Sequence, residues 1–274
     1  MAVLNVTPDS FSDGGKFLDR DHAVGHALQM LNEGADLLDI GGESTRPGAK
    51  TGDTGLPVEE ELRRVVPVIE DIVRERPETV ISVDTYKAEV ARAAVGAGAE
   101  IVNDISALRW DASMTQTLAE LKCGVVLTHT RGRPDQWRTQ PASPDIVAEV
   151  KRDLRDWAET AMNRGIAKDR LMLDPGFGFG KKFDENYPLL ARFAELHELG
   201  FPLLSGTSRK SFIGRTLARD GHDQSPEERL YGTLATVVAS VLQGAHVVRV
   251  HDVKPAVDAV RVADSLAKGG EAQG

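Results

Sequence analysis

Short apolar runs alternate with longer segments of helical periodicity along the whole chain. Each run has the length of a buried strand, and repeated strand–helix units predict a parallel sheet covered by helices. Eight such units within about 250 residues favour a closed barrel over an open doubly wound sheet. The sequence therefore predicts an α/β fold, a single (β/α)8 TIM barrel with long loops after strands one and two. The runs lie near residues 2–6, 36–41, 79–84, 100–104, 124–129, 171–174, 202–206 and 246–251.

Two of the intervening segments have especially clear helical patterns. In 58–75 the apolar positions recur at spacings of three and four, which predicts one buried face. They are Val58, Leu62, Val65, Val66, Ile69, Ile72 and Val73. In 225–243, Ser225, Pro226 and Glu228 predict a helix start with a capping box. The expected buried stripe there is Leu230, Leu234, Val237, Val238 and Val241.

The composition is that of an ordinary globular protein. Of the 274 residues, 41% are hydrophobic and 27% are charged, with no break that would mark a linker. We therefore expect one domain over 1–268 and a frayed tail over 269–274. The sequence contains neither a signal peptide nor an apolar run long enough to cross a bilayer, so we expect a soluble, cytoplasmic protein without a membrane partner.

Charge and cysteine content exclude several classes of function. The net charge of −9 argues against non-specific binding of nucleic acid, which needs a basic surface. An anionic ligand is still compatible if positive charge is concentrated locally. Because Cys123 is the only cysteine, an internal disulfide and a cysteine-based zinc site are both excluded.

One stretch, residues 171–181, combines a strand with a glycine-rich loop. The apolar run ends in Asp174, and the Pro/Gly-rich segment that follows prevents an immediate helix. Asp174 is then expected at the carboxyl end of the strand, with Phe177 and Phe179 offering flat apolar faces nearby. That combination suits a flat heterocycle that carries N–H donors. The alternative is a glycine-rich turn with two core phenylalanines and a capping aspartate.

Polar or charged residues also end the other predicted strands. In a barrel of this kind the reactive groups lie at the carboxyl ends of the strands. Burying such groups without partners costs about 1–3 kcal/mol each, so a barrel kept only for stability would not need one at every strand. In chain order they are Asn5, Asp39, Asp84, Asn103, His129, Asp174, the loop 208–211, and Arg249 with His251.

The loops after strands one and two are long and polar. The first, 5–15, carries carboxylate, amide and hydroxyl oxygens that can bind Mg²⁺, although hydroxyl-rich turns are also common. The second, 41–48, is rich in glycine, and long loops over a site often act as lids. In it, Arg46 can bring a cation over an anionic substrate, or it is simply a solvated surface arginine.

Three further residues have two interpretations each, and one pair indicates an anion site. Asp84 shares a strand face with Ser82 and can stabilise positive charge, or it caps the next helix. His129 is at least as compatible with a satisfied core histidine as with a functional one. Lys210 can donate to a ligand or form a Schiff base, unless it is a surface lysine. Arg249 and His251 point the same way and form an anion site where barrels often bind phosphate.

With these residues assembled, the chain closely resembles the dihydropteroate synthases of folate biosynthesis. The matching motifs extend from residue 4 to residue 252 and are highly specific as a set. They are residues 4–15, 41–48, 82–85, 103–105, 174–181, 208–211 and 249–252. One departure is Thr128-His129-Thr130, because many members of the family carry Met on both sides of the histidine.

The resemblance implies a (β/α)8 barrel that joins 6-hydroxymethyl-7,8-dihydropterin pyrophosphate to p-aminobenzoate and releases pyrophosphate with Mg²⁺, by dissociative substitution. It also implies a homodimer. The implied catalytic residues are Asp84, Lys210, Arg249 and His251. Those for the pterin are Asp84, Asn103, Asp174, Phe177, Gly206, Lys210 and Arg249. Those for the diphosphate are Asn5, Thr45, Arg46, Arg249 and His251. Those for p-aminobenzoate are Phe11, Thr45, Pro47, Phe179 and Ser211, with Asn5 and Asp9 near the metal.

Three other functions are compatible with parts of this pattern. A pterin-binding methyltransferase would keep the Asp and Asn contacts but has no use for the diphosphate set. A Schiff-base aldolase would use Lys210. A pterin-binding protein without turnover would be expected to have lost Asp84, Lys210 or the diphosphate ligands, and all of them are present.

Overall fold

The strands of the barrel follow the predicted order. The computed structural model describes residues 1–6, 16–44, 50–52 and 55–271. Each strand in this part of the chain lies within one of the predicted runs, and the last two are much shorter than predicted. The strands are β1 (Ala2–Asn5), β2 (Leu37–Gly41), β3 (Val80–Asp84), β4 (Ile101–Asp104), β5 (Gly124–Thr128), β6 (Leu171–Asp174), β7 (Leu204–Ser205) and β8 (Val247–Val248).

The strands close into a ring. β1 to β6 form one parallel sheet in sequence order, and β7 pairs with β8. A parallel bridge between Leu173 and Leu203 joins β6 to the β7 run, and a second between Ala2 and Val250 joins the β8 run to β1. The second junction has a hydrogen bond from the Val3 amide to the Val250 carbonyl at 2.9 Å. Every neighbouring pair is thus parallel, which confirms the predicted barrel.

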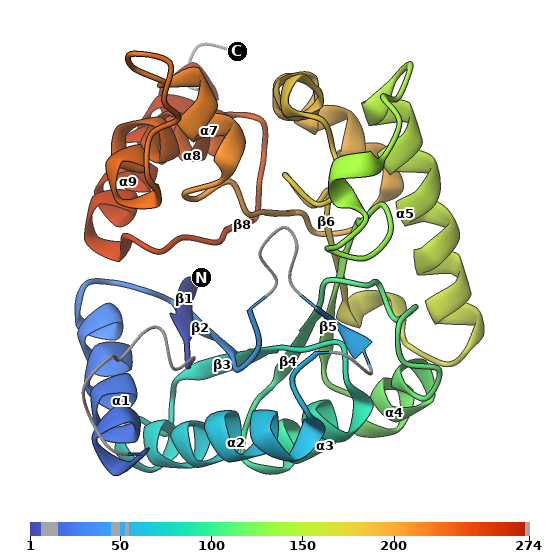
Figure 1. Cartoon of the computed structure of the whole chain (residues 1–274), viewed down its shortest axis with the longest axis vertical. Coiled ribbons are helices and arrows are strands. Elements are labelled where there is room, and N and C mark those ends of the chain that lie inside the picture. Colours follow the sequence, from blue (N-terminus) through green and yellow to red (C-terminus); the bar gives the residue numbers. More distant parts are fainter. Residues whose placement is uncertain (7–15, 45–49, 53–54, 272–274) are drawn as a thin grey trace.

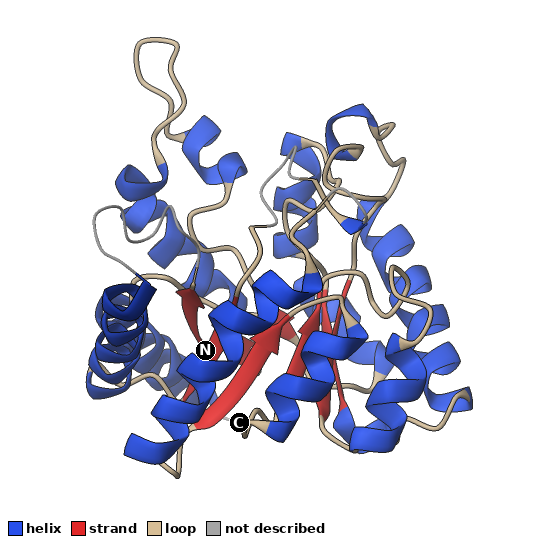
Figure 2. Cartoon of the chain, turned by 60° about the horizontal axis from the view of Figure 1, so that its bottom comes forward, coloured by secondary structure: helices blue, strands red, loops and turns tan. Residues whose placement is uncertain are grey.

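Helices surround this ring (Figures 1 and 2). In Figure 1, α1 to α4 cover the lower side, α5 the right side, and α7 to α9 gather at the upper left. The core lies mainly between the strands and these helices. The helices are α1 (Lys16–Asn32), α2 (Val58–Glu75), α3 (Ala88–Gly96), α4 (Met114–Leu121), α5 (Ile146–Asn163), α6 (Asn186–Ala191), α7 (Ser211–Thr216), α8 (Leu230–Leu242) and α9 (Val253–Glu271).

The interior of the barrel is apolar at the end where the strands begin. Met1, Val126 and Leu204 are buried there against partly buried side chains of the other strands. Because these positions alternate with residues of the outer core, the next inward position on each strand lies one layer closer to the barrel mouth. The polar layer described below is built from those positions.

The two sequence-predicted helices differ in how well the pattern located their buried face. α2 has the predicted bounds. Its buried face includes Val68, which was not predicted, whereas the predicted Val66 is only half-buried. The other begins as a 3₁₀ turn over Pro226–Arg229, where the Ser225 amide donates to Glu228 Oε2 at 2.9 Å, and continues as α8.

The buried face of α8 is mostly hydroxylic, so the predicted apolar stripe is confirmed only for Val237, which is buried, and Leu234, which packs partly buried against the same cluster. Thr233, Thr236 and Ser240 face the barrel. The reason is that Ser205 and Thr207 point outward from the β7 run, and their hydroxyls pair with Ser240 at 2.8 Å and with Thr236 at 2.9 Å. A stripe counted from apolar residues cannot find a face that is held by hydrogen bonds.

The chain ends in a helix longer than expected. α9 continues to Glu271, so the first residues of the predicted tail are helical, and 272–274 lie outside the described residues. Among the helices that the structure describes, none has the length and apolar character needed to cross a membrane.

Candidate active site

Strand alternation places a layer of polar side chains inside the barrel mouth. On β2, Leu38 and Ile40 belong to the outer core, so Asp39 between them points inward. The parallel register puts Asp39 beside Ser82 of β3. The same alternation brings these further residues to the layer: Asn5, Asp84, Asn103, Thr128, Asp174, Gly206 and Arg249.

Arg249 is the centre of this layer. Its Nε donates to Asp39 Oδ2 at 2.6 Å, and its terminal nitrogen donates to Asp84 Oδ2 at 2.8 Å. Asn103 Nδ2 donates to the same Asp39 oxygen at 3.0 Å. One fully buried carboxylate therefore fixes both the guanidinium and the orientation of the amide.

The charges in this group perturb one another. Burial, together with the neighbouring Asp39 carboxylate, raises the pKa of Asp84 to about 7, although Arg249 opposes the shift. Burial disfavours the Arg249 charge, but Asp39 and Asp84 outweigh it and raise the pKa of Arg249 above its usual range. The cation is thus permanent, whereas Asp84 can change its charge near neutral pH.

Asp174 ends β6 as predicted. Its Oδ1 accepts the Gly176 amide at 2.7 Å, and burial raises the pKa of the carboxyl. Its Oδ2 lies 3.7 Å from where a Cβ on Gly206 would be, so the absence of a side chain on Gly206 leaves that oxygen accessible to a ligand. Gly176 has φ of 66°, and a Cβ there would lie 1.9 Å from the His129 carbonyl oxygen, so only glycine fits.

Lys210 lies four residues after the β7 run, and its charge opposes the rise in the pKa of Asp174. Its Nζ lies 3.8 Å from the centre of the Phe179 ring, a cation–π contact. Burial, together with the Arg249 charge, lowers the pKa of Lys210 to about 8, against the opposing effect of Asp174 and Asp84. The lysine is therefore mostly protonated at neutral pH, but its pKa is only about one unit higher than that pH.

His251 is a neutral hydrogen-bonding group here, not a second cation. Burial and the nearby Arg249, Arg209 and Lys210 charges lower its pKa to about 3. The Ser208 hydroxyl accepts the His251 amide at 3.2 Å and lies within hydrogen-bond distance of the ring Nδ1, at 2.9 Å. When the hydroxyl donates to Nδ1, the ring proton is on Nε2 and is a donor for a ligand.

The burial and the contacts of His129 support its interpretation as a core histidine. It is fully buried, stacks on Trp157 at 5.1 Å, and has Nε2 3.3 Å from Asp153 Oδ2. On the other side, Lys181 Nζ lies 2.9 Å from its Nδ1. Burial lowers the pKa of His129 to about 3 and that of Lys181 to about 7.

Two of the predicted ligand residues, Phe177 and Ser211, do not lie in the polar layer. Phe177 is buried in the outer core, with its ring 6.4 Å from those of Phe193 and Phe212. It therefore does not face the mouth, and its predicted pterin contact is wrong. Ser211 is exposed at the first position of α7.

Several predicted residues lie outside the described part of the chain. They are Asp9, Phe11, Thr45, Arg46 and Pro47. Asn5 is described and is exposed at the end of β1. A Cβ on Gly41 would lie 3.9 Å from Asn5 Oδ1 and 3.8 Å from Asp84 Oδ2, so an amide oxygen and a carboxylate oxygen approach the same point.

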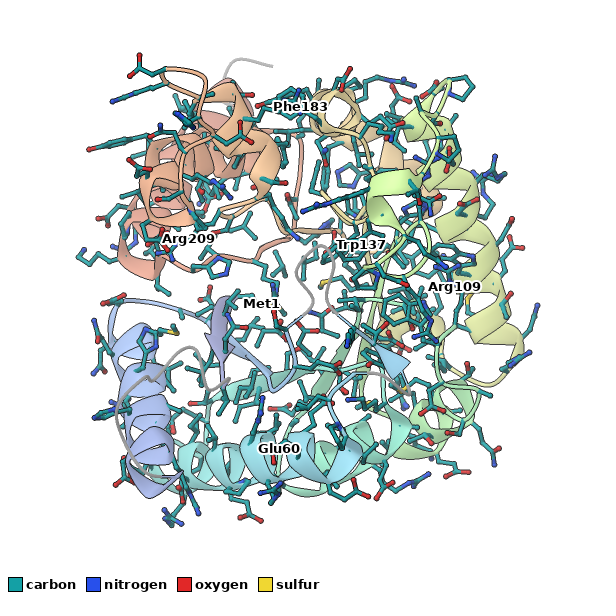
Figure 3. All side chains as sticks on the ribbon, viewed as in Figure 1. Met1, Glu60, Arg109, Trp137, Phe183 and Arg209 are labelled. Atoms are coloured by element: carbon teal, nitrogen blue, oxygen red, sulfur yellow. The ribbon has the colours of Figure 1, made fainter. Side chains whose placement is uncertain are left out.

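The sequence pattern gave no role to Asp39, Ser82 and Trp137. Asp39 appeared only as a strand-end polar residue, and its signal is an aspartate at an inward position between two apolar residues. Within the described chain, Asp39 Oδ1 and Ser82 Oγ are buried and have no hydrogen-bond partner. Trp137, labelled in Figure 3, lies on the loop after β5 and has no local signal.

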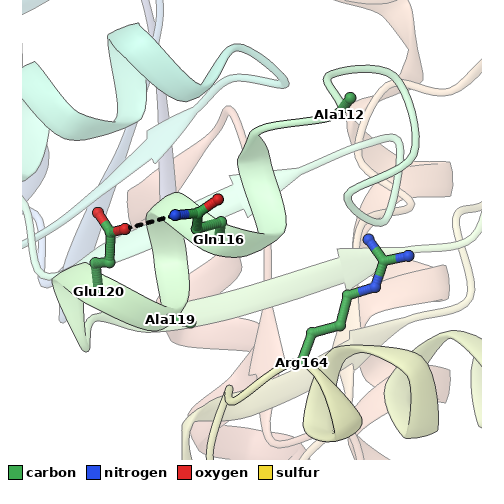
Figure 4. Close-up of a pocket in the computed structure, with 5 residues that line it drawn as sticks. All are labelled: Ala112, Gln116, Ala119, Glu120 and Arg164. Atoms are coloured by element: carbon green, nitrogen blue, oxygen red, sulfur yellow. Dashed lines mark hydrogen bonds between the residues drawn. The ribbon is translucent and has the colours of Figure 1, made fainter.

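A surface hollow lies outside the barrel. Figure 4 shows it between α4 and the end of α5, where Gln116 donates to Glu120 at 3.1 Å. Arg164 completes it, and all three of these side chains are exposed. Because it contains no buried polar group and lies away from the strand ends, it is not part of the site.

Fold and site together define a barrel enzyme whose mouth can hold a flat ligand with hydrogen-bonding edges. Residues 1–251 match the family described as pterin binding enzyme. The polar layer at the carboxyl ends of the strands lies within that range.

Individual relatives narrow the class. The chain is 49% identical to dihydropteroate synthase of Escherichia coli K12, over 97% of this chain and 90% of that protein. Two solved structures of Xanthomonas albilineans dihydropteroate synthase each cover 97% of this chain and 92% of theirs. The one with 4-aminobenzoic acid is 48% identical with a TM-score of 0.88, and the one with 7,8-dihydropteroate is 45% identical with a TM-score of 0.85. The chain belongs to the dihydropteroate synthase family.

Proposed function

We propose that this enzyme, a transferase, condenses 6-hydroxymethyl-7,8-dihydropterin pyrophosphate with p-aminobenzoate to give 7,8-dihydropteroate and pyrophosphate. The observation that carries the proposal is the polar layer in the barrel mouth, where Arg249 joins Asp39 to Asp84 beside Asn103. A carboxylate, an amide and fixed cations in one buried layer suit a heterocycle with donors and acceptors on its edge and an anionic leaving group.

The pterin edge is assigned to Asp174, Asn103 and Lys210. Asp174 Oδ1 is already occupied by the Gly176 amide, so Oδ2 is the atom that accepts N–H groups of the ligand. Asn103 has its amide orientation fixed through Nδ2. Lys210 offers a protonated donor on the same side as Phe179.

The diphosphate is assigned to Asn5, Arg249 and His251, with Thr45 and Arg46 as further candidates. Arg249 supplies a permanent charge, because its pKa is raised. His251 supplies the Nε2 donor that Ser208 fixes. The leaving group would then be held by one cation and two neutral donors from these three residues.

Mg²⁺ fits the donors that the described residues offer. The structure describes no group of three or more His, Cys, Asp or Glu side chains that could hold a metal. Mg²⁺, however, is commonly held by one or two protein oxygens with the substrate phosphates and water. Asn5 Oδ1, close to Asp84 Oδ2, is such a donor, and Asp9 is the second proposed ligand. When bound, the ion would neutralise part of the diphosphate charge.

The proposed chemistry is a dissociative substitution at the pterin methylene. The methylene carbon–oxygen bond breaks, and its electron pair leaves with pyrophosphate. The lone pair of the arylamine then forms the carbon–nitrogen bond, after which the nitrogen loses a proton to solvent. Ionised Asp84 stabilises the positive charge on the pterin, while Arg249 and His251 hold the leaving group.

The p-aminobenzoate side of the site is assigned to Phe179 and Ser211, with Phe11, Thr45 and Pro47 from the first two loops. Phe179 is half-buried, so one part of its ring is available to an aromatic ligand. Ser211, exposed at the start of α7, is a candidate donor to the carboxylate.

Pyrophosphate release from the pterin pyrophosphate with Mg²⁺, measured with and without p-aminobenzoate, tests the proposal. We expect release that depends on p-aminobenzoate and forms dihydropteroate in equal amount. Pterin binding without release would contradict the proposal and favour a binding protein. Methyl transfer from methyltetrahydrofolate in the same preparation would favour the methyltransferase.

We further propose a homodimer in the cytoplasm. Tyr231, Leu242, Val262 and Leu266 are 83%, 50%, 61% and 59% exposed, and they lie on two helices that pack together, α8 and α9. Their burial against a second copy would remove this surface from water. Light scattering after size-exclusion chromatography should give a dimer, and V262D/L266D should give a monomer.

The proposed cytoplasmic location is tested by cell fractionation, in which we expect the protein in the cytoplasmic fraction.

A further inference from the structure

Trp137 makes a contact that the proposed roles do not explain. It begins a 3₁₀ turn, Trp137–Thr139, in the loop between β5 and α5, and it is 5% exposed. Its ring centre lies 4.8 Å from that of Phe179, at an angle of 39°. Phe179 therefore has two neighbours, the indole of Trp137 and the ammonium of Lys210 at 3.8 Å.

The indole is held by hydrogen bonds. Trp137 Nε1 donates to Thr130 Oγ1 and to the Gly132 carbonyl, both at 3.1 Å. The Thr130 hydroxyl donates in turn to the Gly132 carbonyl at 3.1 Å. Thr130 is one of the two threonines that flank His129 in this chain, so the hydroxyl that holds the indole lies directly after the buried histidine.

The same loop also holds the backbone of Phe179. The Arg131 amide donates to the Phe179 carbonyl at 3.4 Å, and the Arg131 guanidinium donates to the Gly180 carbonyl at 3.4 Å. Lys181 Nζ donates to the carbonyls of His129 at 3.2 Å and Phe179 at 3.4 Å. Both the backbone and the ring of Phe179 are thus fixed from one side, which leaves the ring little freedom to turn.

We infer that Trp137, fixed by the Thr130 hydroxyl, is a positioning residue that sets the specificity of the site for its arylamine substrate. It holds the Phe179 ring in contact with Lys210 Nζ, 3.8 Å from the ring centre, and so fixes the position of the ring edge that a flat arylamine would meet. This inference rests on the proposed function, which assigns Phe179 to p-aminobenzoate. Loss of the indole lets the phenyl ring retract, which weakens contact with the planar substrate and admits a bulkier one.

The experiment compares W137L and T130V with wild type and with two matched controls. T130S keeps the hydroxyl. W157L removes another large indole of the same region, which stacks on His129 at 5.1 Å. Steady-state KM is measured for p-aminobenzoate and for the pterin pyrophosphate, and kcat/KM for 4-amino-2-methylbenzoate relative to p-aminobenzoate. Equilibrium binding of p-aminobenzoate is measured in the presence of 6-hydroxymethyl-7,8-dihydropterin and pyrophosphate.

We expect W137L to raise KM for p-aminobenzoate about tenfold, and T130V about threefold because one of two acceptors remains. KM for the pterin pyrophosphate should stay within about twofold, and W137L should shift the kcat/KM ratio toward the methylated substrate. T130S and W157L should leave KM for p-aminobenzoate unchanged, whatever they do to the melting temperature. Unchanged KM and binding in W137L, or an equal rise in both KM values, would overturn the inference.

The outcomes also separate this inference from the proposed function. A wild-type protein that binds p-aminobenzoate but forms no dihydropteroate would refute the function. The inference would then stand if W137L weakens that binding, and fall if it does not. A wild-type protein that neither turns over nor binds p-aminobenzoate would refute both.

Discussion

The Asp39 carboxylate gives the sharpest test of how the site is organised. It is fully buried, and its Oδ2 accepts hydrogen bonds from Arg249 and Asn103. We expect D39N to keep the shape of the side chain while removing the charge that orients both partners. The substitution touches neither the proposed pterin edge nor the diphosphate directly, so its effect reports on positioning.

The magnitude follows from the bonds that weaken. Hydrogen bonds to charged groups contribute about 1.5–3 kcal/mol and neutral ones about 1 kcal/mol, so weakening two of them costs about 2–3 kcal/mol. That predicts a loss in kcat/KM for the pterin pyrophosphate of about 30- to 150-fold. Stability should fall by less than that free-energy cost, because the amide that D39N introduces can donate to Ser82 Oγ, its register neighbour, which within the described chain has no partner.

Steady-state kinetics and thermal unfolding of D39N and D104N provide the assay. Asp104 is also fully buried, but it accepts the Ser106 amide at 2.7 Å and the Leu108 amide at 3.0 Å in a turn outside the barrel interior. D104N should therefore lower the melting temperature and leave kcat/KM within about twofold. A folded D39N enzyme with wild-type kcat/KM would refute the argument, as would a D39N loss confined to stability.

Three further predictions concern other parts of the site. Burial raises the pKa of Asp84 to about 7 and lowers that of Lys210 to about 8, so kcat/KM for the pterin pyrophosphate should fall below pH 7 as Asp84 protonates and above pH 8 as Lys210 loses its proton. A pH profile should show both limbs, and D84N should lower kcat, spare pterin binding and lose the acidic limb. S208A should raise KM for the pterin pyrophosphate about fivefold by releasing the His251 tautomer, with KM for p-aminobenzoate as the control. G176A should destabilise the fold by about 3–5 kcal/mol in denaturant unfolding, because its Cβ would lie 1.9 Å from a carbonyl oxygen and φ is 66°.

The barrel and most of the polar layer were predictable because they follow from local periodicity. A strand that alternates between the core and the interior places Asp84, Asn103 and Asp174 at the mouth once their strand is located. The same alternation does not say which of these groups pair, because Arg249 reaches Asp39 across the ring from a strand 210 residues away. The pairing depends on ring closure, which no local pattern contains.

The wrong prediction for Phe177 has a different cause. Phe177 and Phe179 are two positions apart, which would put them on one face of a strand. Gly176, Gly178 and Gly180, however, have φ values of 66°, 79° and 72°, and left-handed residues remove any simple period. One ring therefore enters the core, while the other faces Lys210. Without the loop geometry, the sequence cannot distinguish the two.

The charge balance of the layer bears on the metal. The overall charge of −9 requires positive charge to be concentrated where an anion binds. Among the described residues of the mouth, Arg249 and Lys210 stand against Asp39, Asp84 and Asp174, and His251 is neutral because its pKa is lowered to about 3. The two cations are thus already balanced by the carboxylates before a ligand binds. A diphosphate would need further positive charge, and the proposed Mg²⁺ at Asn5 and the predicted contact of Arg46 are two candidate sources.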